Sequence, residues 1–482
     1  MPQKNKLVPF LLVFMAMALM CCETQSKQQT VTKPNVVFIM ADDLGYGDIG
    51  AYGQEKIATP HLDKMAKDGM RFTQFYAGTS VCAPSRASLL TGRHTGNTRI
   101  RGNRQHGYRN GQMPLEDDQL TLAEVMKASE YRTGLIGKWG LGNPNTSGDP
   151  MKQGFDFYYG YTDQILAHNY FPEYLIRNGT KEFLNNTVVY QDSTAWHEGL
   201  GSTSIERKTY SNDRFGEEAL EFLESNAEHP FFLYLALTLP HINDEQTPNA
   251  IFEVPDQGRY KDQPWTKNQK DYAAMVTRMD STIGLVRAKL KALNLDKNTL
   301  IIFTSDNGPL RGHRATAFFN SNGPLRGGKR DLYEGGMRMP MLAVWPDQIT
   351  PGITSDHIGA FWDVMPTLAE LSGYQSAIES DGISFLPTLL GKGEQRKHHN
   401  LYWEFHNWEG SLQAVRKDNY KLVRFRALNK DSVRTELYRL SYDLGETEDI
   451  AETFPEIAAE LDSLAQASRT PSEYFKFPEE KQ

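Results

Sequence analysis

The chain has 482 residues, enough for more than one domain, and its composition of 39% hydrophobic, 23% charged and 11% aromatic residues is that of a globular protein. So many aromatic residues argue against extensive disorder. The formal net charge of −8 argues against a general nucleic-acid-binding or membrane-surface protein, although a local group of cations could still hold an anionic substrate.

The first 22 residues have the pattern of a signal peptide. Lys4 and Lys6 precede an apolar run over residues 7–20, which is shorter than a membrane-spanning helix requires. The run ends in Leu-Met-Cys-Cys, which resembles a bacterial lipobox with Cys22 as the lipidated residue. We therefore expect an exported protein of a Gram-negative bacterium, either periplasmic or held at the outer membrane by a lipid anchor, with residues 23–33 as a linker.

The cysteines leave one thiol in the body of the protein. Of three cysteines, two lie in the predicted signal region, so Cys82 has no internal partner. An exported chain usually meets oxidising conditions, and a lone thiol there requires an explanation. Cys82 is either a buried structural cysteine or a functional one.

From residue 33 onward, apolar strands alternate with amphipathic helices, which indicates an α/β domain with a largely parallel sheet. Expected strands cover residues 35–41, 231–237, 300–304 and 341–346, and expected helices cover residues 213–225 and 270–293. Ligands bind beyond the carboxyl ends of such strands. The adjacent carboxylates Asp42 and Asp43 follow the first strand, and they repel each other unless a cation bridges them. The alternative is a solvated turn.

Residues 80–93 carry a Cys-x-Pro-Ser-Arg core beginning at Cys82 and a Leu-Thr-Gly-Arg tail. This segment resembles the signature of the type I sulfatases, in which that cysteine is oxidised to formylglycine. The resemblance implies that one hydroxyl of the hydrated aldehyde attacks sulfur, and that deprotonation of the other expels sulfate. It also implies a maturation partner, either a formylglycine-generating enzyme or an anaerobic sulfatase-maturing enzyme.

Other segments resemble further sulfatase blocks. Gly-Lys-Trp-Gly-Leu-Gly at residues 137–142 is similar to a family block whose lysine, here Lys138, contacts sulfate. Gly140 departs from that block, which usually has histidine there, so the base of the last step is in doubt and His168 is one candidate to replace it. His241 is implied to contact sulfate and to protonate the leaving alcohol.

The remaining blocks complete the implied site. Thr-Ser-Asp-Asn-Gly at residues 304–308 matches the second half of the sulfatase metal site. Lys329 matches the lysine that bridges sulfate and the leaving oxygen, and Arg86 would brace the nucleophile and the metal-site carboxylates. The implied metal ligands are oxygens of Asp42, Asp43, Asp306 and Asn307, together with formylglycine at Cys82 and the sulfate. Oxygen ligands favour Ca²⁺, with Mg²⁺ as the alternative, and disfavour Zn²⁺.

Three histidines are candidate substrate-binding residues: His168, His313 in an arginine-rich loop, and His406. A structural role is the alternative for each. Arg338 is expected to pair with Glu334 and so to hold its loop.

The resemblance implies an alkaline phosphatase-like sandwich, in which a large mixed, mostly parallel sheet lies between helices, followed by a small C-terminal α+β domain with an antiparallel sheet. We place the catalytic domain at residues 34–375, a connector at 376–395 and the C-terminal subdomain at 396–482. Strands are expected at 401–405, 413–416, 420–424, 436–438 and 442–443, and a closing helix at 455–467.

The implied activity is hydrolysis of a sulfate ester, with an O-sulfated carbohydrate of galactose type as the expected substrate. Two alternatives remain. One is a phosphodiesterase or phosphonate hydrolase of the same fold. The other is a non-catalytic protein that binds sulfated glycans.

Overall fold

The computed structural model describes residue 2, residues 33–103, 112–191, 199–406, 410–427 and 433–477, and residue 480. The predicted signal peptide and nearly all of the predicted linker, including Cys22, lie outside the described residues. One compact unit spans Pro34–Gln482. Within the described residues, no helix has both the length and the apolar character needed to cross a membrane.

The unit is built on a ten-stranded mixed sheet with the order β12-β2-β11-β10-β1-β9-β3-β4-β5-β6. These strands are β1 (Asn35–Ala41), β2 (Met70–Tyr76), β3 (Arg132–Lys138), β4 (Phe157–Tyr161), β5 (Tyr174–Arg177), β6 (Thr180–Phe183), β9 (Phe231–Ala236), β10 (Thr299–Ser305), β11 (Arg338–Val344) and β12 (Ile353–Ala360). The central strands β10, β1, β9, β3 and β4 run parallel, whereas β11 is antiparallel to both of its neighbours. A separate hairpin pairs β7 (Thr187–Tyr190) with β8 (Ser202–Glu206).

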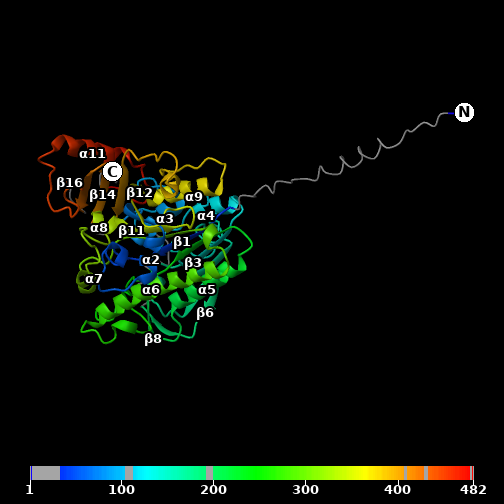
Figure 1. Cartoon of the computed structure of the whole chain (residues 1–482). Coiled ribbons are helices and arrows are strands. Elements are labelled where there is room, and N and C mark those ends of the chain that lie inside the picture. The colour runs from blue at the N-terminus through cyan, green and yellow to red at the C-terminus, as the bar shows by residue number, and fades with distance from the viewer. Residues whose placement is uncertain are drawn as a thin grey trace. The chain divides into compact units, whose positions relative to one another are not determined.

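Helices cover both faces of this sheet (Figure 1). One layer contains α2 (Pro60–Asp68), α5 (Ser211–Ser225) and α6 (Lys267–Ala292), and the other contains α3 (Cys82–Thr91), α4 (Leu122–Ala128) and α9 (Val364–Ser372). Three short helices, α7 (Arg314–Phe319), α8 (Glu334–Met337) and α10 (Leu386–Leu390), lie in the connections. Every residue of β1, β9 and β10 is buried, as expected of strands covered on both faces.

The C-terminal part forms a four-stranded antiparallel sheet of β13 (Leu401–His406), β14 (Gly410–Lys417), β15 (Tyr420–Ala427) and β16 (Val433–Arg439), on which α11 (Pro455–Ala467) packs. Its aromatic side chains join the large sheet, because Trp403 packs against Tyr76 at the end of β2 and against Trp362. The expected fold class, with both sheets, is therefore confirmed.

Several local predictions can be compared with the structure. Pro60 opens α2, Thr121 and Glu124 form a capping box, and α11 has the predicted bounds. Residues 442–443 lie in a turn and are not a strand. The helix of the signature segment, α3, begins at Cys82 itself, and Pro84 lies in its first turn, where no hydrogen-bonding N–H is needed.

Candidate active site

The parallel register of the central strands brings polar residues from distant parts of the chain to one edge of the sheet. Ala41 pairs with Ser305, so Asp42 and Asp43 after β1 lie beside Asp306 and Asn307 after β10. β9 and β3 lie on the other side of β1, and His241 follows β9 while Lys138 ends β3. This is the edge at which ligands of α/β sheets bind.

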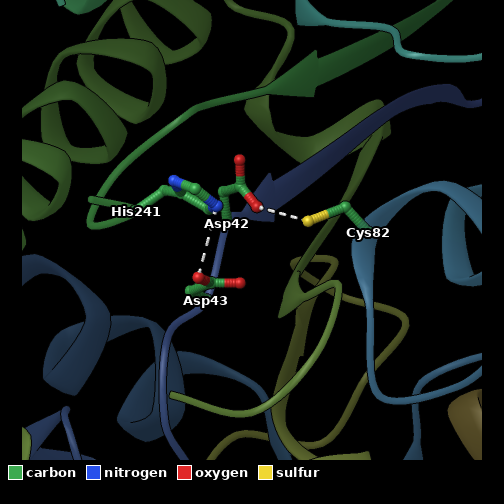
Figure 2. A group of neighbouring side chains, drawn as sticks. All are labelled: Asp42, Asp43, Cys82 and His241. Carbon is green, nitrogen blue, oxygen red and sulfur yellow. Dashed lines mark hydrogen bonds and ion pairs between the residues drawn. The ribbon is translucent and has the colours of Figure 1, made fainter. Parts of the chain in front are cut away.

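Cys82 lies at the start of α3 and faces this group of residues. Its Sγ is 3.4 Å from Asp42 Oδ1, a contact that Figure 2 marks with a dashed line. The residue is only 2% exposed, and burial together with the charge of Asp42 raises the pKa of the thiol. An unmodified Cys82 is therefore a protonated thiol and a poor nucleophile, since the thiolate is the reactive form.

The carboxylates are packed closely together. Asp43 donates its backbone N–H to Asp306 Oδ1 at 3.2 Å and accepts from Asn307 Nδ2 at 2.7 Å. Ligand atoms of Asp42, Asp43, Cys82 and His241 all lie within 4.8 Å of one another (Figure 2). Asp43 adopts a left-handed backbone with φ of 63°, a conformation uncommon for residues other than glycine, although Asp and Asn adopt it more readily than most.

Each carboxylate is paired with a different cation. Lys138 Nζ lies 2.7 Å from Asp42 Oδ2, and Lys329 Nζ lies 2.8 Å from Asp43 Oδ2. The Arg86 guanidinium donates through two nitrogens to Asp306 Oδ2, at 2.8 and 3.0 Å, and is 3.7 Å from Asp42 Oδ1. Two lysines and an arginine thus surround the position beside Cys82.

Burial and the neighbouring charges shift the pKa values of the three carboxylates in different directions. Burial alone raises the pKa of Asp42, but the charges of Lys138 and Arg86 help to outweigh it and hold that pKa well below its ordinary value. Burial raises the pKa of Asp43, and the charge of Asp42 adds to the increase. Burial and Asp42 together raise the pKa of Asp306 to about 7. Three buried carboxylates at this distance thus oppose one another's ionisation.

The donor set suits a hard divalent cation. Asp42, Asp43, Asp306 and Asn307 present oxygen, and the Oδ1 atom of Asn307 is buried with no hydrogen-bond partner among the described residues. A buried acceptor without a donor is costly, and a cation would satisfy it. The residues therefore fit the metal that the sequence motifs imply.

His241 makes two contacts that determine its protonation. Nδ1–H donates to the carbonyl of Ile242 at 2.6 Å, so Nε2 is the acceptor for Lys329 Nζ at 2.7 Å. Burial, followed by the charge of Lys329, lowers the pKa of His241 well below its ordinary value. In the Lys329–His241 hydrogen bond the proton therefore lies on Lys329, and the imidazole is neutral.

Gly140, which departs from the family block, faces a side chain that sequence reasoning missed. A Cβ at Gly140 would lie 2.5 Å from Nε2 of Gln164, and the backbone has φ of +73°. Gln164 thus fills the space that a larger residue at position 140 would need. Its Nε2 is buried and has no partner among the described residues. Only the departure at Gly140 could have pointed to a compensating residue.

The structure separates the three candidate substrate histidines. His168 lies against His241, with their rings stacked at 4.7 Å. His313 caps α7 by accepting from the N–H of Ala315 and packs against Phe252. His406 is buried, with one nitrogen on Glu404 and the other on Ser411, so both ring nitrogens are already bonded. Arg338 pairs with Glu334 at 3.2 Å as expected.

Comparisons with known proteins agree with this geometry. Residues 34–374 match the sulfatase family, and residues 327–469 match the N-sulphoglucosamine sulphohydrolase C-terminal region. Arylsulfatase A of Bos taurus is 32% identical over 462 residues, which cover 89% of this chain and 85% of that protein. N-acetylgalactosamine-6-sulfatase of Homo sapiens is 32% identical over 391 residues, covering 74% and 66%. The chain therefore belongs to the sulfatase family and is a sulfuric ester hydrolase.

Solved structures show the same relationship. Ps i-CgsB, crystallised in complex with k-i-k-neocarrahexaose, superimposes with a TM-score of 0.74 at 27% identity and covers 93% of this chain and 96% of its own. A phosphonate monoester hydrolase of Agrobacterium radiobacter superimposes with a TM-score of 0.60 at 19% identity, covering 90% and 95%, and this likeness concerns the fold alone.

Proposed function

We propose that this sulfatase hydrolyses an O-sulfate ester on a saccharide of galactose type, using formylglycine formed from Cys82 and one divalent cation, Ca²⁺ or alternatively Mg²⁺. The observation that carries the proposal is the position of Cys82, whose Sγ lies 3.4 Å from Asp42 at the edge of a buried carboxylate group. An unmodified thiol there is protonated, so the position calls for chemistry that the cysteine itself does not supply.

The hydrated aldehyde would supply a hydroxyl nucleophile for sulfur, and a second hydroxyl whose deprotonation releases sulfate. The cation would be held by Asp42, Asp43, Asp306 and Asn307 and would stabilise negative charge on sulfate oxygens.

The chain's own cations orient the sulfate group and stabilise the charge that develops on it. Lys138 and Lys329 lie on either side of the Asp42–Asp43 pair, and each holds its N–H groups in a buried site where electrostatic interactions are strong. Arg86 positions Asp306 and, through the Lys138 carbonyl at 2.9 Å, the end of β3. The Lys329–His241 pair is placed to give a proton to the leaving alcohol.

The carbohydrate assignment is supported by the nature of the relatives. N-acetylgalactosamine-6-sulfatase is named for a sulfated amino sugar, and Ps i-CgsB was crystallised with k-i-k-neocarrahexaose. We extend from these to a galactose-type sulfated carbohydrate for this chain. We also propose a formylglycine-generating or anaerobic sulfatase-maturing partner, and export to the periplasm with a possible lipid anchor at Cys22.

The decisive experiment determines the state of position 82. Protein made together with a formylglycine-generating enzyme is digested with trypsin, and the mass of peptide 72–86 is measured. We expect sulfur to be replaced by a carbonyl oxygen. Turnover of 4-nitrophenyl sulfate should then fall by roughly a thousandfold or more in Cys82→Ala.

Two results would contradict the proposal. A thiol that persists under conditions which convert a control sulfatase would exclude the formylglycine mechanism and favour the glycan-binding alternative. Faster turnover of an aryl phosphate than of the matched aryl sulfate would favour the phosphodiesterase alternative.

A further inference from the structure

A second imidazole lies directly beside the ring of His241. The centroids of His168 and His241 are 4.7 Å apart and their planes are inclined by only 19°. His168 ends a short turn over Leu166–His168, whose start is held by Asp163 Oδ1, which accepts from the N–H groups of Ile165 and Leu166 at 2.8 and 2.9 Å. The ring is therefore held in place at the proton-donating end of the site.

The orientation of the His168 ring is set by Glu245. His168 Nδ1 lies 3.3 and 3.4 Å from the two oxygens of the Glu245 carboxylate, whose side chain is only 5% exposed. A carboxylate accepts hydrogen bonds and does not donate them, so Nδ1 carries the proton. In the neutral ring, Nε2 then holds a lone pair, and within the described residues it has no hydrogen-bond partner.

Contacts with the surrounding chain hold Glu245 in this position. The backbone N–H of Glu245 donates to Asn243 Oδ1 at 3.1 Å, and the Asn243 amide is itself held by Glu253 at 3.0 Å. A Cβ at Gly201 would lie 2.4 Å from Gln191 Oε1 and 2.9 Å from Glu245 Oε1, so the absence of a side chain there leaves room for both side chains. Three separate segments thus meet at one buried hydrogen bond.

We propose that His168 is a specificity-determining residue whose Nε2 accepts a hydrogen bond from a sugar hydroxyl next to the sulfated position, and that Glu245 is its positioning residue. The inference rests on the proposed function, because it assumes a sulfated saccharide at the Cys82 site. A site built to accept from a hydroxyl discriminates strongly against a substrate without one, since the acceptor on this 7% exposed residue is then covered by the substrate and left unpaired.

Two substrates separate this role from a general effect on catalysis. The first is the monosulfated galactose derivative that the converted wild-type enzyme cleaves fastest from a panel of positional isomers. The second is 4-nitrophenyl sulfate, which has no hydroxyl beside the sulfated oxygen. We expect His168→Ala to lower kcat/KM on the sugar roughly 10- to 100-fold and on the aryl sulfate less than about threefold.

Glu245 is tested through its effect on His168. Glu245→Ala should show a similar selective loss, and the double variant should be no worse than His168→Ala, because both changes remove the same interaction. Glu245→Gln retains an oxygen that accepts from Nδ1–H and should restore most of the sugar activity. His229→Ala, at an exposed histidine between α5 and β9, is the matched control and should leave both rates unchanged.

These outcomes separate the role proposed for His168 from the function proposed for the whole enzyme. Equal losses on both substrates in His168→Ala, or no loss on either, would overturn the inference while leaving the proposed function intact. Additive losses in the double variant would remove Glu245 from the positioning role. A converted wild-type enzyme that cleaves neither substrate would overturn the proposed function, and the inference with it.

Discussion

Two buried carboxylate sites in this protein use their charges in opposite ways. Glu404 in β13 is a single carboxylate that accepts from four side chains, namely Arg101 at 3.0 Å, His406 at 3.0 Å, Tyr402 at 2.7 Å and Arg469 at 3.0 Å. At the strand ends, three carboxylates share three cations, and the amide oxygen of Asn307 has no partner among the described residues.

The difference separates a structural network from a reactive one. Around Glu404 the donors come from the loop at Arg101, from β13 and from the C-terminal segment, so a single satisfied anion joins parts of the chain that are far apart. At the strand ends, carboxylates oppose one another's ionisation, which is an arrangement that a bound cation relieves. A buried carboxylate whose oxygens all accept hydrogen bonds thus indicates a structural role. Buried carboxylates that lie close together and repel one another indicate a ligand site.

Removing the Glu404 charge tests the structural side of this comparison and should have the largest effect. Glu404→Gln leaves two arginines without their buried counter-charge, and we expect unfolding free energy to fall by about 3–5 kcal/mol. Urea unfolding of the wild type and the variant measures this directly. The control is Glu206→Gln, at an exposed site, which should change stability very little. A loss below about 1 kcal/mol would contradict the structural role.

Removing one carboxylate of the crowded group should instead affect activity. We expect Asp43→Asn to lower kcat/KM about 100-fold, or about 2.7 kcal/mol, because the charged carboxylate ligand of the cation is replaced by a neutral amide. Added Ca²⁺ at about 100 times its Kd should stabilise the wild type by about 2.7 kcal/mol, and Glu404→Gln by a similar amount, but Asp43→Asn much less. Thermal unfolding with and without Ca²⁺ measures the shift. Equal stabilisation of all three proteins would place the cation elsewhere.

The pH dependence of stability should show a smaller effect at the Glu404 site. Burial alone raises the pKa of Glu404, but hydrogen bonds from His406 and Arg101 outweigh it and hold the pKa well below the ordinary value. A depressed carboxylate pKa stabilises the folded state above the unfolded pKa of about 4.3, and this contribution is lost as the pH falls below it.

The difference in unfolding free energy between the wild type and Glu404→Gln should therefore be constant from pH 7 to 5. It should shrink by about 1.4 kcal/mol for each pH unit below about 4. Urea titrations at pH 7, 5, 4 and 3 provide the measurement. A difference that stays unchanged down to pH 3 would show that the charge of Glu404 is not what stabilises the network.

The sequence allowed much of this fold to be predicted because the central strands are long apolar runs followed directly by polar residues. That pattern located β1, β9 and β10, and the parallel register then brings Asp42, Asp306 and Lys138 together. The edge strands β6 and β12 were missed, since most of their residues are half-buried or exposed and they carry no continuous apolar run, and β5 was missed because it has only four residues.

Positions that depend on long-range packing could not be predicted. His406 was considered for substrate binding, but its ring also bonds Ser411 of β14, and only the pairing of β13 with β14 brings these two residues together. Gln164 and Glu245 belong to no motif, and their relation to Gly140 and His168 exists only in the folded chain. Residue type and spacing in the sequence do not predict such contacts.

The burial of the Cys82 helix has a consequence for the order of events during biosynthesis. All ten residues of α3 are buried, and Ser85 donates to the Asp306 carbonyl at 2.6 Å, so the folded protein does not present this segment to another enzyme. The conversion proposed for Cys82 would therefore have to occur before β10 joins the sheet. The 223 residues that separate Cys82 from Asp306 in the sequence would leave Cys82 accessible to the proposed maturing enzyme until β10 is in place.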